Sequence, residues 1–373
     1  MDIYLDHNAT TPVRPEVAEA MMAALAQTGN ASSVHRFGRL ARRGVDDARE
    51  AVAALAGTTA DRVVFTSGGT EANNSALRGT KRRAFVSAVE HDSVLSARAD
   101  ATVLPVDSTG SIDLDGLCDA LNAAPEPVLV SVMYANNETG VVQPVSEVVS
   151  LAREFGALVH CDAIQAAGKL PLSMEDLGVD LLSLSAHKIG GPQGVGALLV
   201  RPDLDLDPLV RGGGQERRRR AGTENVPGIV GFGTAARLAD GGTGQFAAVG
   251  ELRNSMEAQL LENVPDAVLY GIEAERLPNT SCIGLPGVTG EMQVMTLDLA
   301  GIAVSAGSAC SSGKVTPSHV LHAMGQDDDA ARSAIRVSFG RDTRKVEIER
   351  FVEVWTQMAQ RRNHENQARR SVA

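Results

Sequence analysis

Two apolar runs in the sequence end in polar residues of complementary chemistry. Asp162 follows ALVHC (157–161), and Lys188 follows DLLSLS (180–185), where it lies beside Ser185 and His187. A carboxylate at the end of a buried strand is costly unless a cation pairs with it. A lysine surrounded by serine, histidine and glycine differs from the usual solvated surface lysine. The pair therefore suggests a charged site in which an acid and an amine act on the same ligand.

A segment of small residues, SGGTEANN (67–74), follows the apolar run RVVFT (62–66) and opens a helical stretch. Its backbone N–H groups and the Thr70 hydroxyl could bind a phosphate group. Taken alone, the segment is explained better by an ordinary helix cap. Two further strand ends carry His91, in EHDSV, and Asn137, in YANNETG, which alone also suit a structural histidine and a plain turn.

Together these residues suit pyridoxal 5′-phosphate (PLP). The Lys188 amine would form a Schiff base with the aldehyde, and Asp162 would keep the pyridine nitrogen protonated, so that the ring acts as an electron sink. His91 could stack on the ring. Asn137 and Gln165 could bond the ring hydroxyl, whereas Thr70 with Ser185 or His187 could bind the phosphate. Neither a P-loop motif nor a G-x-G-x-x-G motif occurs, which argues against both nucleotide-binding alternatives.

The elements that must position these residues alternate between strands and helices. The expected strands are 62–66, 84–88, 102–106, 127–133, 157–161, 180–185 and 194–200, and the expected helices include 15–27, 39–56 and 146–155. Strands that are apolar on both faces predict an α/β fold with a mainly parallel, seven-stranded sheet between helices. Ligand sites in such sheets lie at the carboxyl ends of the strands. We expect a large cofactor domain at 12–250 and a smaller α+β domain made of 1–11 and 251–373.

Composition excludes several other classes of protein. The 373 residues carry 35 Lys+Arg and 46 Asp+Glu, a net charge of −11, which disfavours direct nucleic-acid binding or a site on an anionic membrane. The four cysteines are too few for a disulfide framework, and the absence of C-x-x-C argues against a zinc site. No run approaches the ~18–20 apolar residues that span a bilayer, and no signal peptide is visible. A cytoplasmic location with reduced thiols is expected.

The chain resembles the NifS/IscS-type cysteine desulfurases, which are PLP enzymes of fold type I and are similar to class V aminotransferases. The matching motifs run in order along nearly the whole chain, and SAGSACSSG is the most specific of them. They are YLDHNATTPV (4–13), GNASSVHRFGR (29–39), FTSGGTEANN (65–74), EHDSV (90–94), NNETGVVQPV (136–145), HCDAIQAAGKLPL (160–172), SLSAHKIGGPQGVGALLV (183–200), GGGQERRRRAGTENVPGIVG (212–231), SAGSACSSG (305–313) and IRVSFGR (335–341).

The resemblance implies a role for each matching residue. Lys188 would be the Schiff-base lysine, Asp162 the pyridinium partner, and His91 the residue that stacks on the ring and assists proton transfer. Gly69, Thr70, Ser185 and His187 would bind the phosphate, Asn137 and Gln165 would contact the ring, and Thr223 would reach the phosphate of a neighbouring subunit. Arg336 would hold the substrate α-carboxylate, with Asn30 as a weaker candidate.

Cys310 lies among small residues only, which is typical of an exposed loop and leaves a nucleophilic and a structural role about equally open. The resemblance decides for the nucleophile: Cys310 would take the sulfur of L-cysteine as a persulfide and leave L-alanine. It further implies a homodimer, delivery to iron–sulfur scaffold or thiolation proteins, and Cys310 as a shared ligand of a transient [2Fe–2S] cluster. We interpret Cys161 as core-facing, Cys118 as helical, and Cys282 as strand or core.

Three other functions stay open from the sequence: a selenocysteine lyase, a class V aminotransferase, and a binding protein that retains the fold. An aminotransferase needs no loop thiol, and the intact set of Lys188, Asp162 and His91 argues against a mere binding protein. The arginine run 217–220 suits a solvated face, a phosphate site or a subunit interface.

Overall fold

The seven predicted strands form one seven-stranded sheet, and the computed structural model describes residues 2–239, 243–307 and 316–372. In sheet order, the strands are β2 (Val63–Thr66), β8 (Gly196–Val200), β7 (Leu181–Ser185), β6 (Leu158–Asp162), β5 (Val128–Met133), β3 (Arg83–Ser87) and β4 (Thr102–Leu104). All neighbouring pairs are parallel except those made by β8, which is antiparallel to both β2 and β7. The predicted fold class is confirmed.

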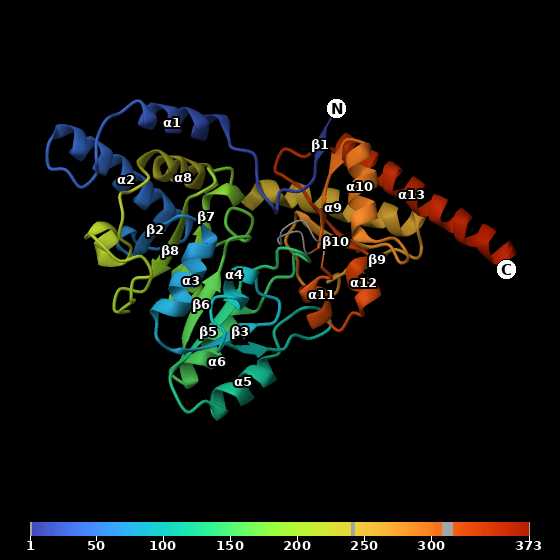
Figure 1. The fold of residues 1–373 in the computed structure, drawn as a ribbon, viewed down its shortest axis with the longest axis horizontal. Coiled ribbons are helices and arrows are strands. Elements are labelled where there is room, and N and C mark those ends of the chain that lie inside the picture. Colours follow the sequence, from blue (N-terminus) through green and yellow to red (C-terminus); the bar gives the residue numbers. More distant parts are fainter. Residues whose placement is uncertain (1, 240–242, 308–315, 373) are drawn as a thin grey trace.

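Both faces of this sheet are buried because alternate side chains enter different apolar clusters. On β6, Val159 and Cys161 join the cluster under α1, α2, α6 and α8, whereas Leu158 joins the cluster under α3 and α4. Helices therefore cover the sheet on both sides (Figure 1). The covering helices are α1 (Pro15–Leu25), α2 (Arg36–Leu55), α3 (Gly69–Gly79), α4 (Asp92–Leu95), α5 (Leu114–Ala123), α6 (Val145–Glu154), α7 (Met174–Leu177) and α8 (Val226–Ala239).

A second core forms in the C-terminal part of the chain, where Phe351 and Trp355 are fully buried. Its strands are β9 (Val268–Tyr270), β10 (Thr280–Gly284), β12 (Ser305–Ala306) and β13 (Ala334–Ser338), in the antiparallel order β12-β13-β10-β9. The N-terminal β1 (Ile3–Tyr4) pairs in parallel with β11 (Ile302–Ala303), so the start of the chain adds to this part. The helices are α9 (Thr243–Asn263), α10 (Gly290–Leu299), α11 (His319–Ala323), α12 (Asp328–Arg332) and α13 (Lys345–Val372).

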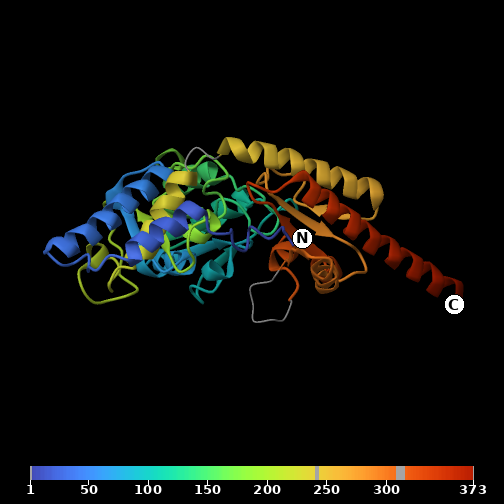
Figure 2. The same ribbon diagram turned by 90° about the horizontal axis from the view of Figure 1, so that it is seen from above.

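The long helices α9 and α13 lie side by side along the outside of this C-terminal part (Figure 2). The predicted domain limits at residues 12 and 250 stay a prediction. Across the described ranges, the structure contains no helix that is both long and apolar enough to cross a membrane.

Candidate active site

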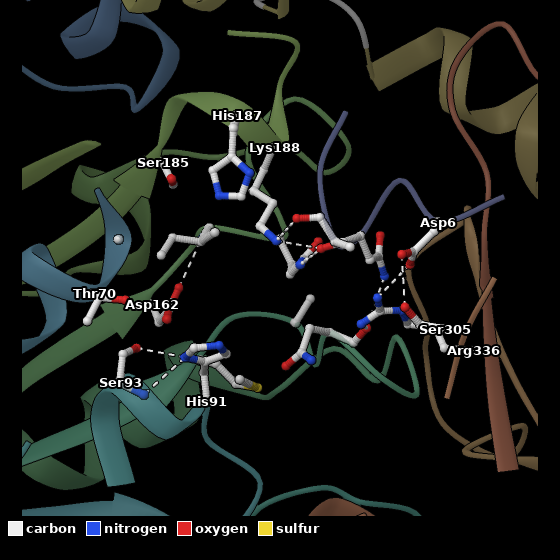
Figure 3. Close-up of a pocket in the computed structure, with 18 residues that line it drawn as sticks. Asp6, Thr70, His91, Ser93, Asp162, Ser185, His187, Lys188, Ser305 and Arg336 are labelled. Carbon is white, nitrogen blue, oxygen red and sulfur yellow. Dashed lines mark hydrogen bonds and ion pairs between the residues drawn. The ribbon is translucent and has the colours of Figure 1, made fainter. Parts of the chain in front are cut away.

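A pocket of about 400 Å³ lies where the carboxyl ends of the central strands meet the C-terminal part of the chain. Most of the predicted site residues line it. They are Gly69, Thr70, His91, Asn137, Asp162, Gln165, Ser185, His187, Lys188 and Arg336. Figure 3 shows Lys188 between two groups, with Thr70, His91 and Asp162 on one side and Asp6, Ser305 and Arg336 on the other. The pocket thus has an end suited to a cofactor and an end suited to a substrate.

Lys188 reaches the centre of the pocket from a short 3₁₀ turn, Ala186–Lys188, that follows β7 directly. Its Nζ donates hydrogen bonds to the backbone carbonyls of Asn8 and Ala9, at 2.5 and 2.8 Å. The lysine therefore projects from one strand end toward the N-terminal segment of the chain. An amine held at this position can reach a ligand bound at either end of the pocket.

Asp162 is the last residue of β6, and burial raises the pKa of its carboxyl. Its Oδ2 accepts from Asn73 Nδ2 at 2.7 Å and its Oδ1 from the Ile164 N–H at 3.0 Å. Neither hydrogen-bond donor is a cation, and the nearby charges of His91 and Lys188 lower the pKa of this carboxyl less than burial raises it. Glu90 is also fully buried, and burial followed by the charge of Asp162 raises its pKa well above the usual range. Glu90 is therefore the carboxyl that stays protonated, and Asp162 is the one suited to hold a cation.

His91 caps the short helix α4, and this contact determines which ring nitrogen carries the proton. Its Nδ1 accepts from the Ser93 N–H at 3.0 Å, so a neutral imidazole bears its hydrogen on Nε2. Burial is the largest cause that lowers the pKa of His91, opposed by the charge of Asp162. A ring that is neutral at pH 7 can stack on an aromatic ligand and exchange a proton through Nε2.

The N-terminus of α3 lies at the end of the pocket where the sequence predicts a phosphate site. The helix begins at Gly69, and Thr70 lies in its first turn. The helix lies close against the sheet because Gly196 of β8 has no side chain: a Cβ there would lie 2.6 Å from the backbone of Gly68. Burial lowers the pKa of His187 to about 4, so this histidine would contact a phosphate as a neutral group. Unpaired N–H groups and the helix dipole favour an anion at this end.

Arg336 lies on β13 between β10 and β12, which places its guanidinium at the opposite end of the pocket. Its Nη2 donates to Asp6 Oδ1 at 2.7 Å, and Ser305 Oγ donates to the other oxygen of Asp6 at 2.8 Å. Among the residues that the structure describes, none forms a hydrogen bond with the buried Nε of Arg336. The guanidinium thus already binds one carboxylate and retains an unused donor for another.

We expect the Arg336→Lys substitution to weaken substrate binding more than turnover. Lysine keeps the positive charge but loses the planar fork that binds a carboxylate through two donors. A hydrogen bond to a charged group contributes about 1.5–3 kcal/mol, so KM for the amino-acid substrate should rise by about 10- to 100-fold. Steady-state kinetics test this, with Arg350→Lys on the exposed face of α13 as the matched control. A KM equal to that of the wild type would show that Arg336 does not hold the substrate.

Two of the predicted site residues do not line this pocket, and a third lies outside the residues that the structure describes. Asn30 is exposed, and its Oδ1 accepts from the Ser32 N–H. Thr223 lines a different pocket with Ser67 and Arg220. Cys310 lies outside the described residues. The roles of all three stay predictions.

Part of the arginine run has specific partners within the chain. Arg220 pairs with Glu71 in the first turn of α3 at 2.8 Å, and the preceding Glu216 forms a buried, bidentate ion pair with Arg49. The run is therefore more than a solvated face, because it is tied to the helix that begins the phosphate-binding end.

The remaining cysteines are placed as the sequence predicts. Cys161 and Cys282 are fully buried on β6 and β10, and Cys118 lies on α5. Burial raises the pKa of Cys161 and of Cys282, which keeps both thiols protonated and poorly nucleophilic.

Sequence reasoning assigned no role to Asn8 and Asp6, which the structure places in the pocket. Asn8 is buried and donates to the Asn137 carbonyl and to Thr280 Oγ1, at 3.1 and 2.8 Å. It thereby joins the strand ends of the large sheet to β10. Both residues belong to YLDHNATTPV, where the run Asp-His-Asn after an apolar start was the available signal.

Comparisons with known proteins agree with this geometry. The family model described as "Aminotransferase class-V" matches residues 3–351. A cysteine desulfurase of Cereibacter sphaeroides is 47% identical over 368 residues, which cover 94% of each chain. The chain belongs to the cysteine desulfurase family. Cysteine desulfurase IscS of Dictyoglomus turgidum is 42% identical, over 95% of this chain and 93% of its own. Among solved structures, a NifS-like protein of Rickettsia africae has a TM-score of 0.90 at 34% identity, covering 96% of this chain and 99% of its own.

Membership in the cysteine desulfurase family implies PLP, and the residues present fit that group. The buried carboxylate of Asp162, whose hydrogen-bond donors Asn73 and Ile164 carry no charge, suits a protonated pyridine nitrogen, and Lys188 supplies the amine that an aldehyde requires. The α3 N-terminus supplies donors for a phosphate. These features lie in one pocket with Arg336 at its far end.

Proposed function

We propose that the protein removes sulfur from L-cysteine and carries it on Cys310. The observation that supports this most is Lys188 Nζ, which lies between the buried Asp162 and the Arg336 guanidinium in one pocket. L-cysteine and the Cys310 thiol would give L-alanine and a Cys310 persulfide. The substrate C–S bond breaks and an S–S bond forms at Cys310. Of the two thiol hydrogens, one replaces the sulfur on the β-carbon of alanine and the other remains on the persulfide.

Each residue of the pocket would have a separate task in this reaction. Arg336 would bind the substrate α-carboxylate through its guanidinium, and Lys188 Nζ would remove the proton from the substrate Cα. Asp162 would hold the ring nitrogen in its protonated form, which requires the carboxylate to be ionised. Bound here, PLP supplies the electron sink for negative charge that develops at the substrate Cα. His91 would exchange a proton through Nε2, and Cys310 Sγ would attack the substrate sulfur.

The assignment is tested by the products of cysteine turnover. We expect wild type to form one alanine for each sulfur that is removed, and Cys310→Ala to lose this turnover. Cys118→Ala is the matched control, because it changes a thiol outside the pocket and should leave turnover intact. Sulfur release that persists in Cys310→Ala would contradict the persulfide, and amino transfer to a keto acid by wild type would favour the aminotransferase alternative.

The acceptor would be an iron–sulfur scaffold or a thiolation protein that meets the Cys310 persulfide. Cys310 would in addition serve as a shared ligand of a transient [2Fe–2S] cluster on such a scaffold. The part of the chain that the structure describes contains no group of three or more metal-ligating side chains, so the remaining ligands would come from the scaffold. A cytoplasmic location stays a prediction.

The active form would be a homodimer, and an exposed apolar surface on α1, α2 and the link between them supports this. Met22 and Leu25 of α1 are 68% and 62% exposed, while Val34 and Phe37 are 88% and 58% exposed. Exposed apolar side chains that gather on one surface are typical of an interface between proteins. We expect Phe37→Asp to shift sedimentation from dimer toward monomer. A wild type that sediments as a monomer would contradict the proposal.

A further inference from the structure

A second buried lysine lies behind the pocket and is not explained by the proposed reaction. Lys169 is 5% exposed, and in the described part of the chain it forms no ion pair. Its Nζ donates to Gln165 Oε1 at 2.8 Å and approaches Asn8 Oδ1 at 3.4 Å. Gln165 and Asn8 both line the pocket, whereas Lys169 does not. Lys169 is therefore joined to the pocket lining by hydrogen bonds to these two residues.

This contact determines which way the Gln165 amide faces. A protonated lysine side chain offers donors alone, and Lys169 Nζ donates to the carbonyl oxygen of Gln165. The amide nitrogen then faces the other side, where Nε2 donates to the Asn8 carbonyl at 2.9 Å. A reversed amide would place two acceptors, Gln165 Oε1 and Asn8 O, against each other. Lys169 and the Asn8 carbonyl thus hold the same orientation from opposite sides.

The Asn8 carbonyl also connects the Gln165 amide with Lys188. Lys188 Nζ donates to the same oxygen at 2.5 Å, so the amide nitrogen of Gln165 and the reactive amine share one acceptor. In PLP, the ring hydroxyl is on the carbon next to the one that bears the aldehyde. A group beside Lys188 Nζ is therefore well placed to contact that ring oxygen.

We propose that Lys169 is a positioning residue that keeps the Gln165 amide nitrogen directed at the ring oxygen of the cofactor, so that this oxygen meets a donor and is held deprotonated. This inference rests on the proposed function, because it assumes that PLP binds to Lys188. The contact does not depend on the charge of Lys169, since an ammonium and a neutral amine both retain N–H donors.

The surroundings of Lys169 are compatible with a positioning role. Lys188, Arg336 and His7 are the charged or titratable groups that interact with it in the described chain. Burial, followed by the charges of Lys188 and Arg336, lowers the pKa of Lys169 to about 7. Burial thus disfavours the charged form of this amine, but both the charged and the neutral form can donate a hydrogen bond.

The experiment is a pH titration of the visible absorbance of the cofactor-loaded protein. A donor aimed at the ring oxygen stabilises its deprotonated form. Lys169→Met removes the amine that orients the Gln165 amide, so the amide nitrogen is no longer held toward the ring oxygen. The midpoint at which the bound cofactor loses its proton should therefore rise by roughly one pH unit, a tenfold change in the equilibrium constant. Lys169→Gln keeps a donor without the charge and should titrate closer to wild type than to Lys169→Met. Lys345→Met, on exposed α13, is the control and should match wild type.

Two results would overturn the inference: a Lys169→Met midpoint equal to that of wild type, or equal shifts in Lys169→Met and Lys169→Gln, which would indicate charge rather than orientation. Thermal unfolding of each variant establishes that it is folded. The proposed function fails separately, if wild type itself shows no cofactor absorbance or forms no alanine from cysteine.

Discussion

The Lys188→Ala protein is expected to lose alanine formation by about 10⁴-fold or more, because under the proposed function the change removes both the amine that binds the cofactor and the base at the substrate Cα. The structure supports this size of effect, since Lys188 Nζ reaches the centre of the pocket. Alanine formed from L-cysteine is the measurement, and the visible absorbance of the purified protein is the second readout.

The matched control for this substitution is Lys345→Ala, which changes an exposed lysine at the start of α13. It should retain both turnover and absorbance. If Lys188→Ala formed alanine at a rate close to that of wild type, Lys188 would not be the residue that binds the cofactor. Lys169, which interacts electrostatically with Lys188, is the other lysine close to it.

Asp162→Asn is the second substitution with a large expected effect. It keeps the shape of the side chain, although its amide oxygen can accept only one of the two hydrogen bonds that Asn73 Nδ2 and the Ile164 N–H donate to the carboxylate. It also removes the negative charge that we propose stabilises a protonated ring nitrogen. Loss of one such preorganised electrostatic contact reduces turnover by on the order of 10³-fold. Turnover with saturating L-cysteine is the measurement, and cofactor content determines whether binding or turnover has changed.

The acid limb of the pH profile provides a further test of Asp162. Burial raises the pKa of its carboxyl, so in wild type the required anion is lost at a higher pH than for an exposed aspartate. A bound cationic ring opposes this shift. The pH profile of Asp162→Asn should lack the acid limb that the titration of this carboxyl causes in wild type. An unchanged rate in Asp162→Asn would contradict the assigned role.

The large sheet was predictable because its strands are buried on both faces. The run ALVHC places Val159 and Cys161 in one cluster and Leu158 in another, and such continuous apolar runs between helices indicate a covered, mainly parallel sheet. The reversed direction of β8 was not predicted, since an apolar run has the same pattern in either direction. The strands β1, β11 and β12 have two residues each, too few to show a period.

The site was predictable where a residue directly follows a strand, as Asp162 and Lys188 do. Asn8 was missed because its partners are distant in sequence, with Thr280 lying 272 positions away, and a hydrogen bond of that range leaves no local pattern. From the resemblance alone, Asn30 was expected near the substrate carboxylate and Thr223 near the phosphate of a neighbouring subunit. Thr223 lies outside the pocket of its own chain, which is compatible with a role at the phosphate site of a neighbouring subunit. That role stays a prediction.

The measurement that tests the central claim most directly is peptide mass spectrometry of wild type after one brief exposure to L-cysteine, with thiols alkylated before digestion. We expect one additional sulfur atom on the wild-type peptide that contains Cys310. The same peptide of Lys188→Ala, treated in the same way, should carry no additional sulfur. An additional sulfur on Cys118, Cys161 or Cys282 instead, or an unmodified Cys310 while alanine accumulates, would contradict the central claim.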